Sequence, residues 1–218
     1  MPELDFQVTG VEPRANGFTP LLLFQLEIAN QPPTEQIQSV LLQAQIQIRS
    51  PQRHYTARER EKLGELFGPP SEWGRTLRNR LWTIAHATIG AFSGSTRGQL
   101  PVPCSYDLNI AATRYCYALE DGEVPLLFLF SGTVFYTNAE GRLQAQQISW
   151  NKEALYAMPV RLWKEMMNSH FPNSAWLYLH RDVFDRLCAY KREAGLATWE
   201  QTIERLLPAV NERAEVVA

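Results

Sequence analysis

The chain has 218 residues, of which 45% are hydrophobic and 20% are charged, so it can bury a sizeable core. Its formal net charge of −2 argues against a nucleic-acid-binding protein, which would usually carry a basic face or tail. No apolar run reaches the ~20 residues of a membrane span. The N-terminal sequence MPELDFQV lacks the basic and apolar regions of a signal peptide, so we expect a cytoplasmic protein.

Three alternating segments open the chain. Apolar residues occupy every second position over residues 3–9, 22–28 and 40–48, and glutamines form the polar face of the third segment. Strict alternation of this kind is typical of antiparallel strands with one solvated face. Because no helical pattern separates the three segments, they predict a sandwich or barrel and not βαβ units.

A helical pattern replaces the alternation over residues 56–81. Thr56 followed by Glu59 predicts a capping box, and a Gly-Pro-Pro sequence ends that helix. A second short helix is predicted from Ser71 to about Leu81. We therefore expect a helical insertion between strands of one sandwich.

Strand patterns return after this insertion. Alternation predicts a strand from Trp82 to Phe92, and two prolines limit residues 99–103 to a short edge strand. Residues 106–119 fit either a strand or a helical turn. We favour a strand that continues through about Tyr117.

The most apolar run of the chain is Val124–Tyr136, VPLLFLFSGTVFY. Apolar residues occupy both parities, which predicts a central strand buried on both faces. Gly132 in the middle of the run is typical of a bulge or of a close backbone approach. A turn over residues 138–141 and a second strand over residues 143–150 complete a long hairpin.

Three helices are predicted at the end of the chain. The first begins at Pro159, the second covers residues 182–194, and a Thr198/Gln201 capping box opens the third. These helices are too few and too short to bury their apolar stripes on one another. We therefore expect them to cover one face of the sheet that carries the central hairpin.

Together these elements predict a mainly β protein with α-helices, of the α+β class. The expected architecture is an antiparallel β-sandwich of about seven or eight strands, with a helical insertion near 56–81 and a C-terminal cap of three helices. We expect residues 1–150 to form the sandwich with its insertion. Residues 151–218 are expected to form the helical cap, packed on the sandwich as one compact unit.

Motifs for catalysis are missing from the sequence. The chain has no G-x-S-x-G, no phosphate-binding loop and no G-x-G-x-x-G after a strand. Its four histidines include no pair at helical spacing, and its three cysteines include no C-x-x-C. We therefore predict no catalytic residues, no metal and no cofactor, and we interpret Cys116 and Cys188 as inert core thiols.

The aromatic-rich helical end is the best candidate for a binding surface, because Trp, Tyr and Met are enriched at protein interfaces. The candidate partner-binding residues are Trp163, Met167, Trp176, Tyr178, Tyr190 and Trp199. Alternatively, these side chains fill the seam between the helices and the sandwich. We favour this alternative, because aromatic residues at helical spacing usually belong to a core.

Several strings spread over nearly the whole chain resemble one uncharacterised bacterial family, a domain of unknown function. The strings include LFGPPSEWGRTLR, LPVPCSYDLNIAATRY, LEDGEVPLLFLFSGTVFY and PNSAWLYLHRDVFDRLCAYK. The family is associated with gene clusters for nickel–iron uptake hydrogenases, beside maturation genes. The resemblance implies an accessory, assembly or structural partner of such an enzyme, and it supplies no catalytic residues.

Three functions remain open at this point. The first is a non-enzymatic accessory or binding protein that docks a hydrogenase subunit or maturation factor. The second is a chaperone-like protein with an apolar groove for clients. The third is an enzyme with a dispersed site, such as Asp107, Asp121 and His180. A homo-oligomer is compatible with all three, since edge strands and an aromatic face can self-associate.

Overall fold

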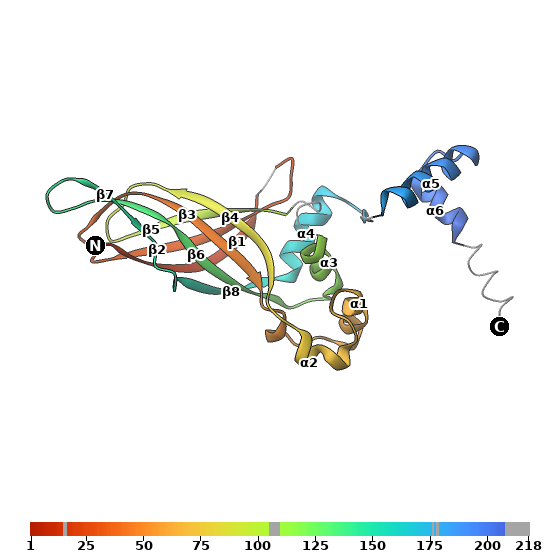
Figure 1. Ribbon diagram of the computed structural model, residues 1–218, viewed down its shortest axis with the longest axis horizontal. Helices are drawn as coiled ribbons and strands as arrows, with labels where there is room; N and C mark the ends of the chain where they lie inside the picture. The colour runs from red at the N-terminus through yellow and green to blue at the C-terminus, as the bar shows by residue number, and fades with distance from the viewer. Residues whose placement is uncertain (15–16, 105–109, 176, 178, 208–218) are drawn as a thin grey trace. The chain divides into compact units, whose positions relative to one another are not determined.

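The chain forms two compact units, residues 1–174 (unit 1) and residues 175–218 (unit 2). The computed structural model describes residues 1–14, 17–104, 110–175, 177 and 179–207. Unit 1 is a two-sheet sandwich with helices gathered at one end, and unit 2 is a helical hairpin (Figure 1). Each unit is described by itself below.

Unit 1 contains eight strands in two antiparallel sheets, which confirms the predicted α+β class and the sandwich. Sheet A has the order β1–β2–β5, with strands β1 (Glu3–Pro13), β2 (Leu21–Gln31) and β5 (Ser95–Pro103). Sheet B has the order β4–β3–β6, with strands β4 (Arg80–Ile89), β3 (Gln36–Ile48) and β6 (Glu123–Thr137). Strands β7 (Leu143–Gln147) and β8 (Glu153–Pro159) both pair with β6. Strand β5 ends sheet A, as its prolines predict.

The sandwich core lies between the two sheets. The inward residues of strands β2, β3 and β6 are buried. Aromatic rings from the two sheets contact one another across the core. Phe6 of sheet A stacks on Phe130 of sheet B with ring centroids 4.5 Å apart, and Phe24 meets Phe128 edge-on at 5.1 Å. Burial of each of these phenylalanine side chains contributes about 1.5–3 kcal/mol to the free energy of folding, so this layer is the main source of stability.

Strand β6 is buried on one face only, so the prediction of two buried faces is wrong. Phe128 and Phe130 point into the core, whereas Leu127, Leu129 and Phe135 on the other parity are half-buried. Of the three helices expected to cover the other face, one lies in unit 1 and two lie in unit 2. Helix α4 (Val160–His170) packs against β1, β8 and helix α3 (Ile110–Ala118).

Gly132 marks the place where β6 changes its neighbour. A Cβ atom there would lie 2.0 Å from the carbonyl oxygen of Leu41, and the residue has φ +135°. The N–H of Ile148 donates to the Gly132 carbonyl at 3.0 Å, and the N–H of Phe130 donates to the Lys152 carbonyl at 2.8 Å. These two hydrogen bonds lie between the β7 and β8 ladders. The short distance to the Leu41 carbonyl confirms the predicted close backbone approach at Gly132. Only glycine fits this position.

The helical insertion between β3 and β4 is confirmed, with a shorter second helix than predicted. It contains η1 (Ser50–Gln52), α1 (Ala57–Phe67), η2 (Pro70–Glu72) and α2 (Trp73–Thr76). The capping box forms, since Thr56 Oγ1 accepts from the Glu59 N–H at 3.1 Å and Glu59 Oε2 accepts from the Thr56 N–H at 2.9 Å. The helix predicted to about Leu81 ends at Thr76, because Arg80 already pairs with β3.

Residues 110–118 form a helix, α3 (Ile110–Ala118), so the strand predicted through Tyr117 is wrong. The reason lies in which side chains are buried. Ala112, Tyr115, Cys116 and Leu119 are buried at helical spacing, and this packing overrides the alternation of the sequence. The first part of the predicted strand, residues 106–109, lies outside the described residues.

The strand predicted over residues 143–150 is confirmed over residues 143–147, and a further strand that was not predicted follows it. β7 ends at Gln147, a turn carries the exposed Trp150, and β8 continues from Glu153. Strand β8 was missed because apolar residues occupy both parities of its sequence. Ala154, Tyr156 and Met158 point inward, but Leu155 and Ala157 on the exposed parity are apolar too. The helix expected at Pro159 is confirmed as α4, with Pro159 as its N-cap residue.

Unit 2 holds helices α5 (Arg181–Glu193) and α6 (Trp199–Leu206). The predicted capping box is confirmed, since Thr198 Oγ1 accepts from the Gln201 N–H at 3.2 Å. The rings of Phe184 and Trp199 join the helices, with centroids 5.5 Å apart. Among its described residues only Thr202 is buried, so the hairpin lacks an apolar core of its own.

Candidate functional site

Four of the six predicted partner-binding residues belong to the described structure, two in unit 1 and two in unit 2. Trp163 and Met167 are buried in unit 1, at 2% and 0% exposure, and the Trp163 ring meets that of Tyr117 at 4.9 Å. Tyr190 is half-buried and Trp199 is 37% exposed in unit 2. The other two, at positions 176 and 178, lie outside the described residues. Trp163 and Met167 therefore belong to the interior of unit 1.

A different surface is unusual, namely the outward side of sheet B. In an antiparallel ladder, directly opposite residues point to the same face. The register defines four rows, from β4 through β3 and β6 to β7 or β8: Leu81–Gln47–Leu127–Leu155, Ile84–Gln45–Leu129–Glu153, His86–Gln43–Ser131, and Thr88–Leu41–Thr133–Gln147. We call these rows the outer face of sheet B.

Large apolar side chains are exposed on this face. Leu41 is 51%, Ile84 is 46% and Leu155 is 57% exposed to solvent. The polar residues of the four rows are almost all neutral amides and hydroxyls, and Glu153 at the rim is the one carboxylate. A solvated sheet face normally carries charged side chains, so this composition is closer to that of an interface core.

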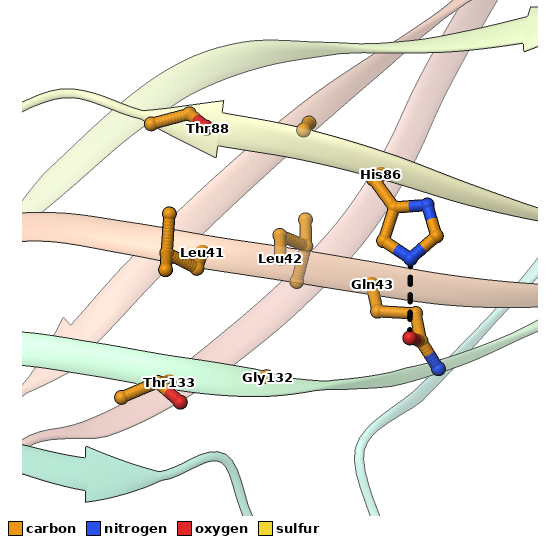
Figure 2. A pocket seen from close by; sticks show the side chains of 8 residues that line it. Leu41, Leu42, Gln43, His86, Thr88, Gly132 and Thr133 are labelled. Atoms are coloured by element: carbon orange, nitrogen blue, oxygen red, sulfur yellow. Dashed lines mark hydrogen bonds between the residues drawn. The ribbon is translucent and has the colours of Figure 1, made fainter.

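The middle of the outer face is hollowed (Figure 2). The hollow has a volume of about 420 Å³. It lies above Gly132, which has no side chain, and between Leu41, His86 and Thr133. His86 Nε2 lies 3.2 Å from Gln43 Oε1, so the Nε2–H tautomer donates to the amide oxygen. His86 is thus a hydrogen-bonded sheet residue, and the hollow presents both apolar and hydrogen-bonding groups.

The outward side of sheet A has the opposite character. Asp5, Glu27 and Arg97 point outward there, and Glu27 lies directly opposite Arg97 in the ladder. Lys152 reaches across from the β7–β8 turn to Glu3 at 2.7 Å and to Asp5 at 2.8 Å. The hydrogen bond from Lys152 lowers the pKa of Glu3. Burial alone would lower the pKa of Lys152, but the bonds to the two carboxylates outweigh burial and raise it.

The most buried ionic group, Arg53 with Glu59, has a structural role. Their side chains are 10% and 1% exposed and approach to 2.7 Å. Arg53 also donates to the carbonyls of Asp121 and Glu123, at 2.7 and 2.6 Å. Burial alone would raise the pKa of Glu59, but N–H donors from Glu120 and Thr56 and the guanidinium outweigh it and lower this pKa. The pair fastens helix α1 to the turn before β6.

Two of the three cysteines are buried, and the described residues of the proposed dispersed site belong to different units. Burial raises the pKa of the Cys104 thiol to about 12 and also raises that of Cys116, whereas Cys188 is half-buried. Asp121 is a turn residue of unit 1 and His180 is the N-cap residue of α5 in unit 2. Position 107 lies outside the described residues.

Within the described part of the chain, no three His, Cys, Asp or Glu side chains are grouped as a metal ion would require. Among the same residues, no helix has the length and apolar character needed to cross a membrane.

Sequence reasoning missed the outer face of sheet B, although its signal was present. The second apolar parity of β6, with Leu127, Leu129 and Phe135, was interpreted as buried. The glutamines of β3 were interpreted as an ordinary wet face. The register places these two groups side by side on one exposed surface, which alternation within single strands does not reveal.

Comparisons with known proteins give two similar solved structures and one family. No curated protein matches it. It is similar to the solution structure of a protein described as late embryogenesis abundant, at 15% identity and a TM-score of 0.31, over 73% of this chain and 72% of that one. It is also similar to the crystal structure of the protein described as ApaA from Bordetella pertussis, at 12% identity and a TM-score of 0.27, over 72% and 95%.

These TM-scores are too low to carry an argument about function. The family comparison is more extensive, because the match spans residues 1–215. The chain belongs to DUF6084, a family of unknown function.

Proposed function

We propose that the protein is a non-enzymatic binding protein that docks a partner protein on the outer face of sheet B. The observation that carries this proposal is the composition of the four rows. They expose leucine and isoleucine among neutral amides and hydroxyls, whereas the outward side of sheet A carries charged side chains. Contiguous exposed apolar surface with a polar surround is typical of an interaction site.

The chemistry of the face defines the chemistry of the partner surface. A charged group buried against these rows would lose its hydration without gaining a counter-charge, which costs several kcal/mol. Glutamine, serine and threonine offer both donors and acceptors, so they pair with neutral polar groups. We therefore propose a partner surface that is apolar and hydrogen-bonding, and not a nucleic acid or a strongly charged protein face.

The size of the face is compatible with such a contact. Strands spaced ~4.8 Å apart, with outward residues ~6.6 Å apart, give four strands and four rows an area of about 500 Å² before side chains are counted. With protruding side chains this approaches the ~800 Å² that each partner buries in a standard interface.

The family resemblance supports a finer proposal about the partner. Because that family is associated with nickel–iron uptake hydrogenase gene clusters, we propose a hydrogenase subunit or maturation factor as the protein that docks. The role would then be assembly or support of the enzyme, with no chemistry contributed by this chain.

Affinity purification from the native host tests this proposal. Tagged wild-type protein is compared with Ile84→Lys, which places a charge in the apolar rows, and with Gln99→Lys on the outer face of sheet A as the matched control. We expect a hydrogenase component to co-purify with the wild type and with Gln99→Lys, and to be lost with Ile84→Lys. Equal recovery with all three proteins, or no specific partner with any, would refute the proposal.

A chaperone-like role is the second candidate, and the exposed Leu41, Ile84 and Leu155 favour it to the same extent. The two roles differ in selectivity. A chaperone-like protein would suppress the aggregation of unrelated unfolded proteins, and Ile84→Lys would reduce this suppression. A dedicated binding protein would leave unrelated aggregation unchanged while still retaining its partner.

A further inference from the structure

A second hollow lies in the helical insertion and shares no residue with the outer face of sheet B. It has a volume of about 360 Å³ and lies between the segment 51–55, helix α1 and helix α2. Arg53, His54 and Arg60 line it on the polar side, and no acidic residue lines it. The hollow therefore combines enclosure with an excess of cationic donors.

Two of these three basic residues are unpaired. Within the described residues, the side chains of Arg60 and His54 have neither an ion-pair partner nor a hydrogen bond, and both residues are exposed. Two other arginines of the insertion are ion-paired, Arg58 with Glu120 and Arg75 with Glu72, and Arg80 donates to the Leu66 carbonyl. An unpaired arginine beside a hollow without carboxylates is available to an anionic ligand.

The buried Arg53 supplies a second, independent observation. Its two terminal nitrogens are occupied by Glu59 and by main-chain carbonyls. Its Nε is buried and has no hydrogen-bond partner in the described structure, although the side chain is only 10% exposed. A buried donor without an acceptor is rare in native proteins, and this one belongs to a side chain that lines the hollow.

The remaining walls of the hollow are apolar. Trp73 donates its indole N–H to the Gly68 carbonyl at 2.9 Å and is 7% exposed, so a small part of its ring lines the hollow. The Tyr55 hydroxyl forms hydrogen bonds with the Ser50 carbonyl at 2.9 Å and with the Tyr115 hydroxyl at 3.0 Å. Leu77 and two prolines complete these walls. An occupant therefore needs an apolar body as well as a negative charge.

We propose that this hollow binds an organic oxyanion, with its negative group at Arg60 and His54 and its apolar body against Trp73 and Leu77. Guanidinium and imidazole groups bind carboxylate and phosphate oxygens by the same charge-assisted hydrogen bonds. The oxyanion is either a carboxylate or a phosphate ester, and one probe of each class distinguishes the two. Binding of an oxyanion in this hollow is a function additional to partner docking, and it does not depend on the proposed docking.

Titration of the full-length protein, followed by ¹⁵N NMR, tests this site. The probes are N-acetyl-leucine and phenyl phosphate as anions, and N-acetyl-leucinamide as the neutral match of the first. We expect saturable shifts of the Trp73 indole N–H and the Gly74 amide with one or both anions at millimolar concentration, and none with the amide. Preference between the two anions identifies the source.

Two variants of helix α1 complete the test. Arg60→Gln removes the unpaired cation from an exposed position, so folding should be unaffected, and Lys62→Gln removes an exposed cation of the same helix that does not line the hollow. We expect the dissociation constant to rise about tenfold for Arg60→Gln and to change less than about twofold for Lys62→Gln. Equal weakening by both variants, equal binding of the neutral amide, or no saturable binding of either anion would overturn the proposal.

Discussion

The two outward sides of the sandwich are built by the same strand alternation around the same core, yet they carry different chemistry. Sheet A turns Asp5, Glu27 and Arg97 to solvent, with opposite charges facing one another in the ladder. Sheet B turns leucine, isoleucine and glutamine outward. Because outward residues contribute little to the core, this difference is not required by folding. It points to a different use of the two faces.

The largest expected effect concerns the core that both faces share. Phe128→Ala should destabilise unit 1 by about 3–5 kcal/mol, because Phe128 is fully buried and packs against Phe24 of the opposite sheet. Urea denaturation followed by tryptophan fluorescence measures the change. A loss below about 1 kcal/mol would show that the sheets do not depend on this layer.

The next largest effect is expected for the buried ion pair of Arg53 and Glu59, which should contribute more stability than the surface charges of sheet A. Glu59→Gln leaves Arg53 without its carboxylate partner and should cost roughly 3 kcal/mol at neutral pH. The pKa of Glu59 is lowered in the folded state, so its contribution is complete above the unfolded pKa and is lost as the pH falls through the folded value.

The stability difference between wild type and Glu59→Gln should therefore shrink as the pH falls below about 4.5, the ordinary value for this carboxyl. Denaturant melts of both proteins from neutral to acidic pH measure it. A difference that stays constant over this range would contradict the assigned role of the carboxylate.

A smaller effect is expected where sheet A is tied to the β7–β8 turn. Lys152→Met removes two ion pairs at the sheet edge while keeping the apolar stem, and it should cost about 1 kcal/mol. Thermal melts in low and high salt measure this contribution, which should decrease as salt screens it. A loss above about 3 kcal/mol would mean that the turn is more deeply buried than its contacts indicate.

The smallest effect on stability is expected on the outer face of sheet B. Ile84→Lys and Gln99→Lys place the same charge on the two outward sides, and both should change the free energy of unfolding by no more than about 0.5 kcal/mol. Equilibrium denaturation of both variants checks this. Strong destabilisation by Ile84→Lys alone would show that Ile84 belongs to the core of the protein and not to a free face.

Much of the fold was predictable, because the relevant signals are local. Alternation located the early strands, and the Thr56/Glu59 capping box located the start of α1. What failed depends on contacts between distant segments. Tyr115 is part of a helix because it packs against Tyr55, and β8 exists because β6 offers it an edge. The candidate face was missed for the same reason, since neighbouring strands assemble it.

Site-specific photo-crosslinking in the native host tests the central claim most directly. A photoreactive phenylalanine analogue replaces Ile84 on the outer face of sheet B in one protein and Gln99 on the outer face of sheet A in another. The account predicts a discrete covalent adduct with one protein partner from position 84 and none from position 99. No adduct from position 84, or the same adducts from both positions, would contradict it.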